Sequence, residues 1–114
     1  MRVAQLRKDD GTVVCAHCAI ASTPLARMKG LLGRSSLDAG EGMLFPRTGS
    51  IHMFFMRFAI DAVFCDDDLR VLKVVRGLKP WRMAAASGAK VTIELPPGGA
   101  AGIEPGDRLV HGPT

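Results

Sequence analysis

Residues 50–68 read SIHMFFMRFAIDAVFCDDD and hold four of the five Phe residues and two of the six Met residues of this 114-residue chain. His52, Arg57 and Asp61 interrupt this apolar run. A charge inside such a run is costly unless it is paired, hydrogen-bonded or open to a wet pocket. The stretch is therefore the first place to look for both a core strand and a site.

The alternation of side chains in this stretch is typical of a β-strand. The even-numbered side, from His52 to Phe64, predicts a core-facing surface, and the other side turns polar only at Arg57 and Asp61. A strand covering residues 51–65 would be unusually long, so we expect a bend or bulge near residues 57–59. On a straight strand Arg57 and Asp61 would lie about 13 Å apart. A bend would bring them within reach of a pair.

Six further short stretches have β-strand character and are separated by Gly, Pro and Asp turns: residues 2–6, 12–15, 43–45, 70–75, 90–95 and 108–111. The first two form a hairpin, and the turn at residues 66–68 closes a second one. In residues 90–95 we expect Val91, Ile93 and Leu95 to point inward and Thr92 and Glu94 outward. Residues 76–82 predict a loop, and residues 83–88 predict a linker.

One short helix is predicted from Thr23, which can cap it, through Pro24 to Lys29, with Gly30 as its end. About seven short strands with one short helix indicate a mainly β fold, either a small β sandwich or a partly closed barrel. The length fits a single domain covering residues 1–114.

The composition excludes some classes of function. The net charge is +4, and the basic residues are scattered, which fits an anionic small molecule or no charged partner. With no Tyr and one Trp the chain has few stacking platforms, so no nucleic acid is expected. No run approaches the about 18 apolar residues of a membrane span. As it stands the sequence predicts a cytoplasmic protein, and a removed leader would make it periplasmic or exported.

Cys15 and Cys18 form a CxxC pair, which fits half of a zinc site, a redox pair or two inert thiols. Zinc needs about four ligands, and the other candidates, His52, Cys65 and His111, are distant in sequence. A redox pair expects a helix start beside it, and residues 19–21 have strand character. We predict no metal and no cofactor, while the use of the pair stays open.

Several ordered motifs resemble the DUF192 family, also called UPF0127, of uncharacterised prokaryotic proteins. They are TPLAR at 23–27, GLLGR at 30–34, GMLF at 42–45, MRFAIDAVF at 56–64 after His52, ELPPG at 94–98 and GD at 106–107. The resemblance covers roughly residues 18–110. It implies a compact, mostly β fold and no established activity. Many relatives carry an export signal, a Trp-Met-Lys version of residues 55–57 and a Pro at position 59, from all of which this chain departs.

The candidate ligand-binding residues are His52, Arg57, Asp61, Trp81, Arg34 and Glu94. Our leading hypothesis is a binding module with a basic-rimmed pocket for a small anionic or polar ligand. One alternative is a hydrolase that uses His52 with Asp61 or Glu94. Another is a protein-interaction domain that docks through the Trp81 loop or a sheet edge.

The same residues also have structural readings. Asp61 would then pair with Arg57 or accept backbone N–H groups at a bend, and Glu94 would do likewise with Arg27 or Arg34.

Overall fold

The computed structural model describes residues 2–23, 26 and 30–113, and strands make up nearly all of its regular secondary structure. The strands within these residues are β1 (Arg2–Lys8), β2 (Val13–Ile20), β3 (Glu41–Pro46), β4 (Ser50–His52), β5 (Ile60–Cys65), β6 (Val71–Leu78), β7 (Met83–Ala85), β8 (Val91–Leu95) and β9 (Leu109–Pro113). The predicted N-terminal hairpin is confirmed, since β1 pairs antiparallel with β2. Gly11, at φ 95°, supplies the positive φ angle of its turn.

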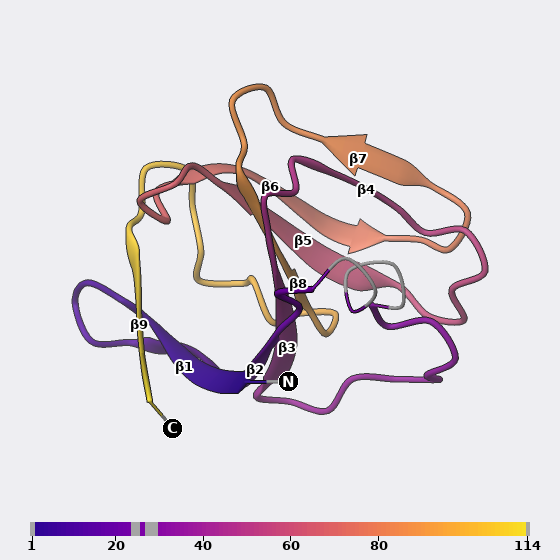
Figure 1. Cartoon of the computed structure of the whole chain (residues 1–114), viewed down its shortest axis with the longest axis horizontal. Coiled ribbons are helices and arrows are strands. Elements are labelled where there is room, and N and C mark those ends of the chain that lie inside the picture. Colours follow the sequence, from indigo (N-terminus) through magenta and orange to yellow (C-terminus); the bar gives the residue numbers. More distant parts are fainter. Residues whose placement is uncertain (1, 24–25, 27–29, 114) are drawn as a thin grey trace.

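Seven strands form one curled sheet in the order β6-β5-β8-β3-β2-β1-β9, in which β2 and β3 run parallel and the other neighbours antiparallel (Figure 1). Hydrogen bonds also join its two ends: Arg70 bridges to Arg108, and the Leu109 N–H donates to the Leu69 carbonyl at 2.9 Å. The predicted mainly β fold is confirmed as a partly closed barrel.

Apolar side chains cover both faces of the middle of this sheet. One cluster, which includes Leu6, Ile93 and Leu109, lies on one face, and another, which includes Phe45, Met53 and Phe64, lies on the other. Every residue of β5 and β8 is therefore buried. The expectation that Thr92 and Glu94 point outward is wrong, because apolar clusters cover both faces of the sheet at β8 and leave it no solvent-facing side.

The central stretch is two strands and not one bent strand. β4 ends at His52, the chain turns through residues 53–59, and β5 begins at Ile60. The break is longer than the predicted bend. It also exchanges the expected core-facing and outward-facing positions at residues 52 and 53. His52 is exposed and Met53 is buried, whereas Phe55 points to solvent.

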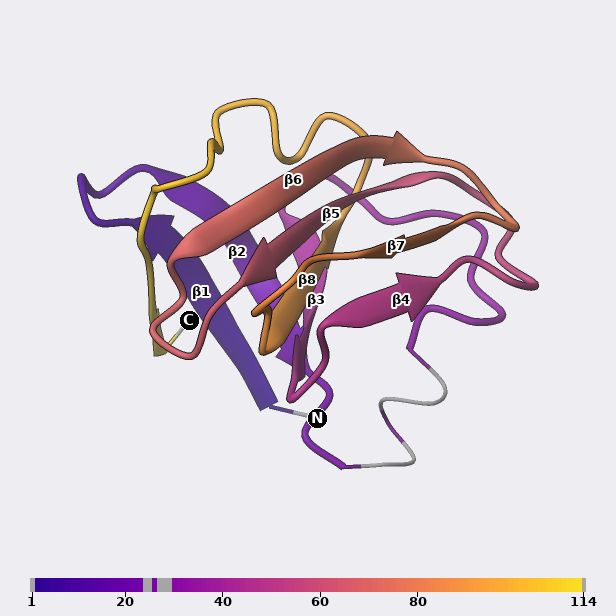
Figure 2. The same ribbon diagram turned by 90° about the horizontal axis from the view of Figure 1, so that it is seen from above.

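The part predicted as loop and linker contains more strand than expected. β6 continues to Leu78, and β7 pairs antiparallel with β4 to form a two-stranded ribbon. Figures 1 and 2 place this ribbon beside β5 and β6, with the loops at residues 53–59 and 79–82 together at one end of the longest axis, away from the C-terminus.

The helix predicted over residues 23–29 falls mostly on positions outside the described residues. Among those that are described, no helix combines the length and apolar character that crossing a bilayer requires.

Candidate functional site

A cluster of aromatic side chains covers the end of the β4–β7 ribbon. His52 stacks on Phe54 with ring centroids 4.8 Å apart, Phe54 lies 6.0 Å from Trp81, and Phe55 meets Trp81 edge-on at 4.9 Å. Met83 follows on β7. We call these five residues, His52, Phe54, Phe55, Trp81 and Met83, the aromatic tip.

The aromatic tip is unusually exposed for its composition. Phe55 is 72% exposed, Trp81 59% and Met83 69%. Beneath them Met53 and Met56 are buried in the core cluster that contains Phe45 and Phe64, so the methionines anchor the loop while the aromatic rings face solvent. Large apolar groups that gather at the surface typically mark an interaction site.

The backbone holds two of these side chains in a costly conformation. Phe55 has φ 65° and Trp81 has φ 70°, in the left-handed region that favours glycine. Such a conformation costs a bulky residue about 1–3 kcal/mol and is enriched at functional sites. Cross-loop hydrogen bonds maintain it: the Trp81 N–H donates to the Met53 carbonyl at 2.8 Å, and the Met53 N–H donates to the Arg82 carbonyl at 2.7 Å.

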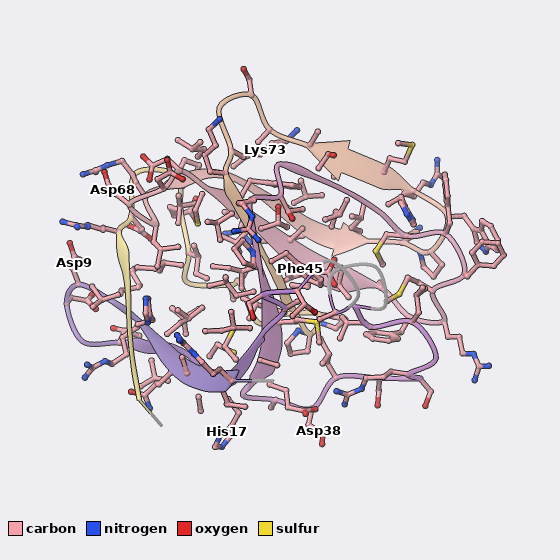
Figure 3. The ribbon with its side chains drawn as sticks, in the orientation of Figure 1. Asp9, His17, Asp38, Phe45, Asp68 and Lys73 are labelled. Atoms are coloured by element: carbon pink, nitrogen blue, oxygen red, sulfur yellow. The ribbon has the colours of Figure 1, made fainter. Side chains whose placement is uncertain are left out.

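The two stretches of chain that carry the aromatic tip contain no acidic residue. Residues 42–60 and 69–93 contain no Asp or Glu, and they hold eight of the 15 Lys and Arg residues: Arg47, Arg57, Arg70, Lys73, Arg76, Lys79, Arg82 and Lys90. Arg57, Lys79 and Arg82 lie on the tip loops, are exposed, and form no ion pair within the described residues. Asp9 and Asp68 lie at the opposite end of the molecule (Figure 3).

Asp61 serves the backbone. Its carboxylate accepts N–H groups from Gly77 at 2.9 Å, Gly98 at 3.1 Å and Ala100 at 3.0 Å, and the residue is 2% exposed. Of the two structural roles predicted for Asp61, the structure thus has the one in which it accepts backbone N–H groups. Within the described residues its carboxylate forms no ion pair with Arg57 or any other cation. The residue therefore ties the turn at 97–100 to the β5–β6 hairpin.

Glu94 is 7% exposed on β8, and burial raises the pKa of its carboxyl group to about 7. No hydrogen bond to that carboxyl is formed by the described residues, and Arg27 lies outside them. Arg34 is not its partner, because Arg34 pairs with Glu41 at 3.0 Å. The Asp38 N–H and that Arg34 contact together lower the pKa of Glu41.

The three cysteines are free and buried. A hydrogen bond from Cys18 lowers the pKa of the Cys15 thiol, and the same contact, with burial, raises that of Cys18. Burial raises the pKa of Cys65 to about 12. Among the described residues no three His, Cys, Asp or Glu side chains gather as metal ligands would.

A second surface feature lies away from the aromatic tip. A hollow of about 520 Å³ is lined by residues of β2, β3, β8 and β9, among them Ile20, Leu44 and Leu109, and by the polar side chains of Arg108 and His111. None of the six candidate residues lines it.

The structure thus brings His52 and Trp81 together, through Phe54, and places Arg57 on the adjacent loop. It does not bring Asp61, Glu94 or Arg34 into contact with them. The sequence reasoning missed Phe54, Phe55 and Met83, although the run Met-Phe-Phe-Met at 53–56 carried a signal. Four consecutive large apolar side chains cannot all face one core.

The fold and the site define a small, partly closed β barrel that carries an exposed aromatic and basic tip. The chain belongs to the DUF192 family, described as an uncharacterized ACR, whose model matches residues 5–111.

Curated relatives are similar over parts of their length. A UPF0127 protein of Thermococcus sibiricus is 34% identical over 98 residues, which cover 82% of this chain and 63% of that protein. A UPF0127 protein of Pyrococcus horikoshii is 43% identical over 63 residues, covering 53% of this chain and 54% of that protein. The matched part therefore spans less than two thirds of either relative.

Two solved structures share the fold. A protein of unknown function from Novosphingobium aromaticivorans superposes with a TM-score of 0.80 at 27% identity, covering 95% of this chain and 83% of the other. A Sinorhizobium meliloti protein, provisionally named a transcription regulator, gives a TM-score of 0.82 at 23% identity, covering 96% and 92%. The second likeness shows the fold alone.

Proposed function

We propose that this protein is a binding module that docks on a partner through the aromatic tip. The observation that carries the proposal is the pairing of exposure with strain: Phe55 and Trp81 both face solvent, and both are held at positive φ. Solvent exposure gives these side chains little stabilising role, so their conformation favours a role in recognition.

The geometry favours docking through the aromatic tip over the hypothesis of a pocket for a small ligand. The pocket hypothesis placed Asp61, Arg34 and Glu94 with His52, Arg57 and Trp81. Asp61 is occupied by three backbone N–H groups, and Glu94 is buried on β8.

A hydrolase has less support for a related reason. His52 is exposed, and its Nδ1 accepts the Phe54 N–H at 3.4 Å. Neither Asp61 nor Glu94 hydrogen-bonds to His52, all three being described residues. The imidazole therefore lacks the carboxylate partner that the hydrolase hypothesis gave it, a group that would orient and activate the base.

Trp81 is the only tryptophan of the chain and reports on the site directly. Protein labelled with 5-fluorotryptophan gives one ¹⁹F resonance, which can be followed while soluble-protein, nucleic-acid and membrane fractions of the host are added in turn. We expect one fraction to shift or broaden that resonance, because the partner covers the indole ring.

The control is the double variant Phe55→Ser and Met83→Ser, which removes two exposed apolar side chains and leaves Trp81 in place. It should keep the thermal unfolding midpoint of the parent and lose the ¹⁹F response. A resonance that no fraction alters in the parent, or that responds equally in the variant, overturns the proposal.

A further inference from the structure

We infer that the partner of the aromatic tip is an anionic lipid surface, on which the two tip loops rest while their apolar side chains enter the interface. This inference rests on the proposed function and names its partner. Phe55 and Trp81 lie in the loops at residues 53–59 and 79–82, which come together at one end of the longest axis (Figure 2), and Met83 begins the adjoining strand β7; all three are exposed. Tryptophan side chains favour the boundary between lipid headgroups and hydrocarbon.

The shape requirement of an interface separates a lipid partner from a protein partner. Three side chains that are 59–72% exposed present roughly 400 Å² in total, since a large aromatic side chain buries about 150–250 Å² when fully covered. A stable protein interface buries about 800 Å² on each partner, about 57% of it apolar, and needs a partner surface of matching shape. A bilayer takes up a small convex tip without requiring a matching surface.

The arrangement of the rings separates lipid from single-stranded nucleic acid. Nucleic-acid binders offer bases a flat, open ring face. Here the Trp81 ring already contacts Phe54 and Phe55, the latter edge-on at an interplanar angle of 61°. Met83, the third exposed group, is a flexible thioether that suits disordered apolar surroundings.

The charge around the aromatic tip supplies the complementarity to an anionic surface. Arg57, Lys79 and Arg82 are exposed on the same loops as the aromatic rings, and no Asp or Glu occurs in residues 42–60 or 69–93. The acidic side chains Asp9 and Asp68 lie at the far end of the molecule (Figure 3). Negative lipids attract such cations, and no nearby carboxylate on these segments opposes them.

The test is association with vesicles of phosphatidylglycerol and phosphatidylcholine, followed by the emission of Trp81. We expect the emission to move to shorter wavelength with these vesicles and to be quenched when the phosphatidylcholine carries bromine on its acyl chains. Vesicles of phosphatidylcholine alone should bind at least tenfold more weakly.

Two double variants separate the apolar and the electrostatic contributions to vesicle binding. Phe55→Ser with Met83→Ser should weaken binding more than tenfold, and Lys79→Gln with Arg82→Gln should weaken it about thirtyfold. Their matched controls are Val3→Ser with Val13→Ser and Arg2→Gln with Arg7→Gln, which remove exposed side chains of similar kind from β1 and β2. Thermal unfolding of every variant confirms that it is folded.

Equal binding to neutral vesicles, or an equal loss in the controls, overturns the inference. So does an emission change with a single-stranded oligonucleotide in place of the vesicles. If vesicles have no effect while a soluble host fraction still alters the ¹⁹F resonance, the lipid partner is wrong and the binding module stands. If neither responds, both are wrong.

Discussion

At the scale of single residues, Asp61 shows how one carboxylate organises a distant turn. Its two oxygens accept three backbone N–H groups from positions 16 to 39 residues away. Those N–H groups would otherwise lie inside the fold without a partner, which is costly.

Replacing Asp61 by Asn should lower the free energy of unfolding by about 3 kcal/mol. The amide keeps one acceptor oxygen, but its NH₂ group would face backbone N–H groups that need an acceptor. Urea denaturation measures this. The control is Asp68→Asn on the exposed β5–β6 turn, expected to stay within about 0.5 kcal/mol of the parent. An Asp61→Asn protein that is fully stable yet loses partner binding would instead make Asp61 a recognition residue.

Glu94 predicts a dependence of stability on pH. Its pKa is about 7 in the folded protein and 4.5 as the ordinary value, so between these values the folded state binds more protons. Its contribution to the free energy of unfolding therefore falls as pH rises from about 4.5 to 7, by about 3 kcal/mol in all. Urea unfolding at pH 5 and pH 8 should show this fall in the parent and not in Glu94→Gln. The same fall in both proteins would rule it out.

The sequence identified Asp61 and Glu94 as polar residues at odds with their surroundings, and both are buried. It could not identify the donors to Asp61. Gly77, Gly98 and Ala100 contribute backbone groups, which any residue except proline carries, so no side-chain pattern marks them.

At the scale of elements, the break between β4 and β5 determines what the surface presents. Phe and Met are good strand residues, so residues 51–65 predict a continuous strand. The positive φ of Phe55 overrides that preference, because the cross-loop hydrogen bonds of Met53 fix the turn. A turn that depends on partners near residues 81–82 cannot be read from residues 53–59 alone.

Replacing Phe55 by Gly should raise the free energy of unfolding by about 1 kcal/mol, because glycine adopts φ 65° without strain. The same variant should lose partner binding. Thermal unfolding and vesicle association, measured side by side, check both effects.

Met83→Gly is the comparison, since Met83 lies in strand β7 and has no positive φ; glycine should destabilise the protein there. If the free energy of unfolding falls as much in Phe55→Gly as in Met83→Gly, the backbone at Phe55 is not strained and this prediction is wrong.

At the scale of the whole molecule, the curled sheet behaves as one unit because its two ends are joined. β9 pairs with β1, and residues 106–109 bond to residues 69–71 at the start of β6. The positions of most strands followed from the sequence, since turn residues and alternation are local, but the division of the central stretch into β4 and β5 and the strand β7 did not. The order of the strands did not, because the parallel pairing of β2 with β3 and the insertion of β8 between β3 and β5 are long-range.

Truncating Leu109 to Ala should lower the free energy of unfolding by about 3 kcal/mol, because the residue is 2% exposed and packs in the core between the joined ends. The protein should still unfold in one transition, shifted as a whole. Val110→Ser, at an exposed neighbouring position, should change little. Two separate transitions in the Leu109→Ala variant would contradict the joined barrel.

The most direct test of the docking surface is the quenching of Trp81 fluorescence by acrylamide. The free protein should be quenched as an open tryptophan is, since 59% of the residue is exposed. With vesicles of phosphatidylglycerol and phosphatidylcholine present, quenching should fall several-fold, because the lipid interface covers the indole. A tryptophan that is shielded in the free protein, or one that stays equally open with the vesicles, would contradict this account.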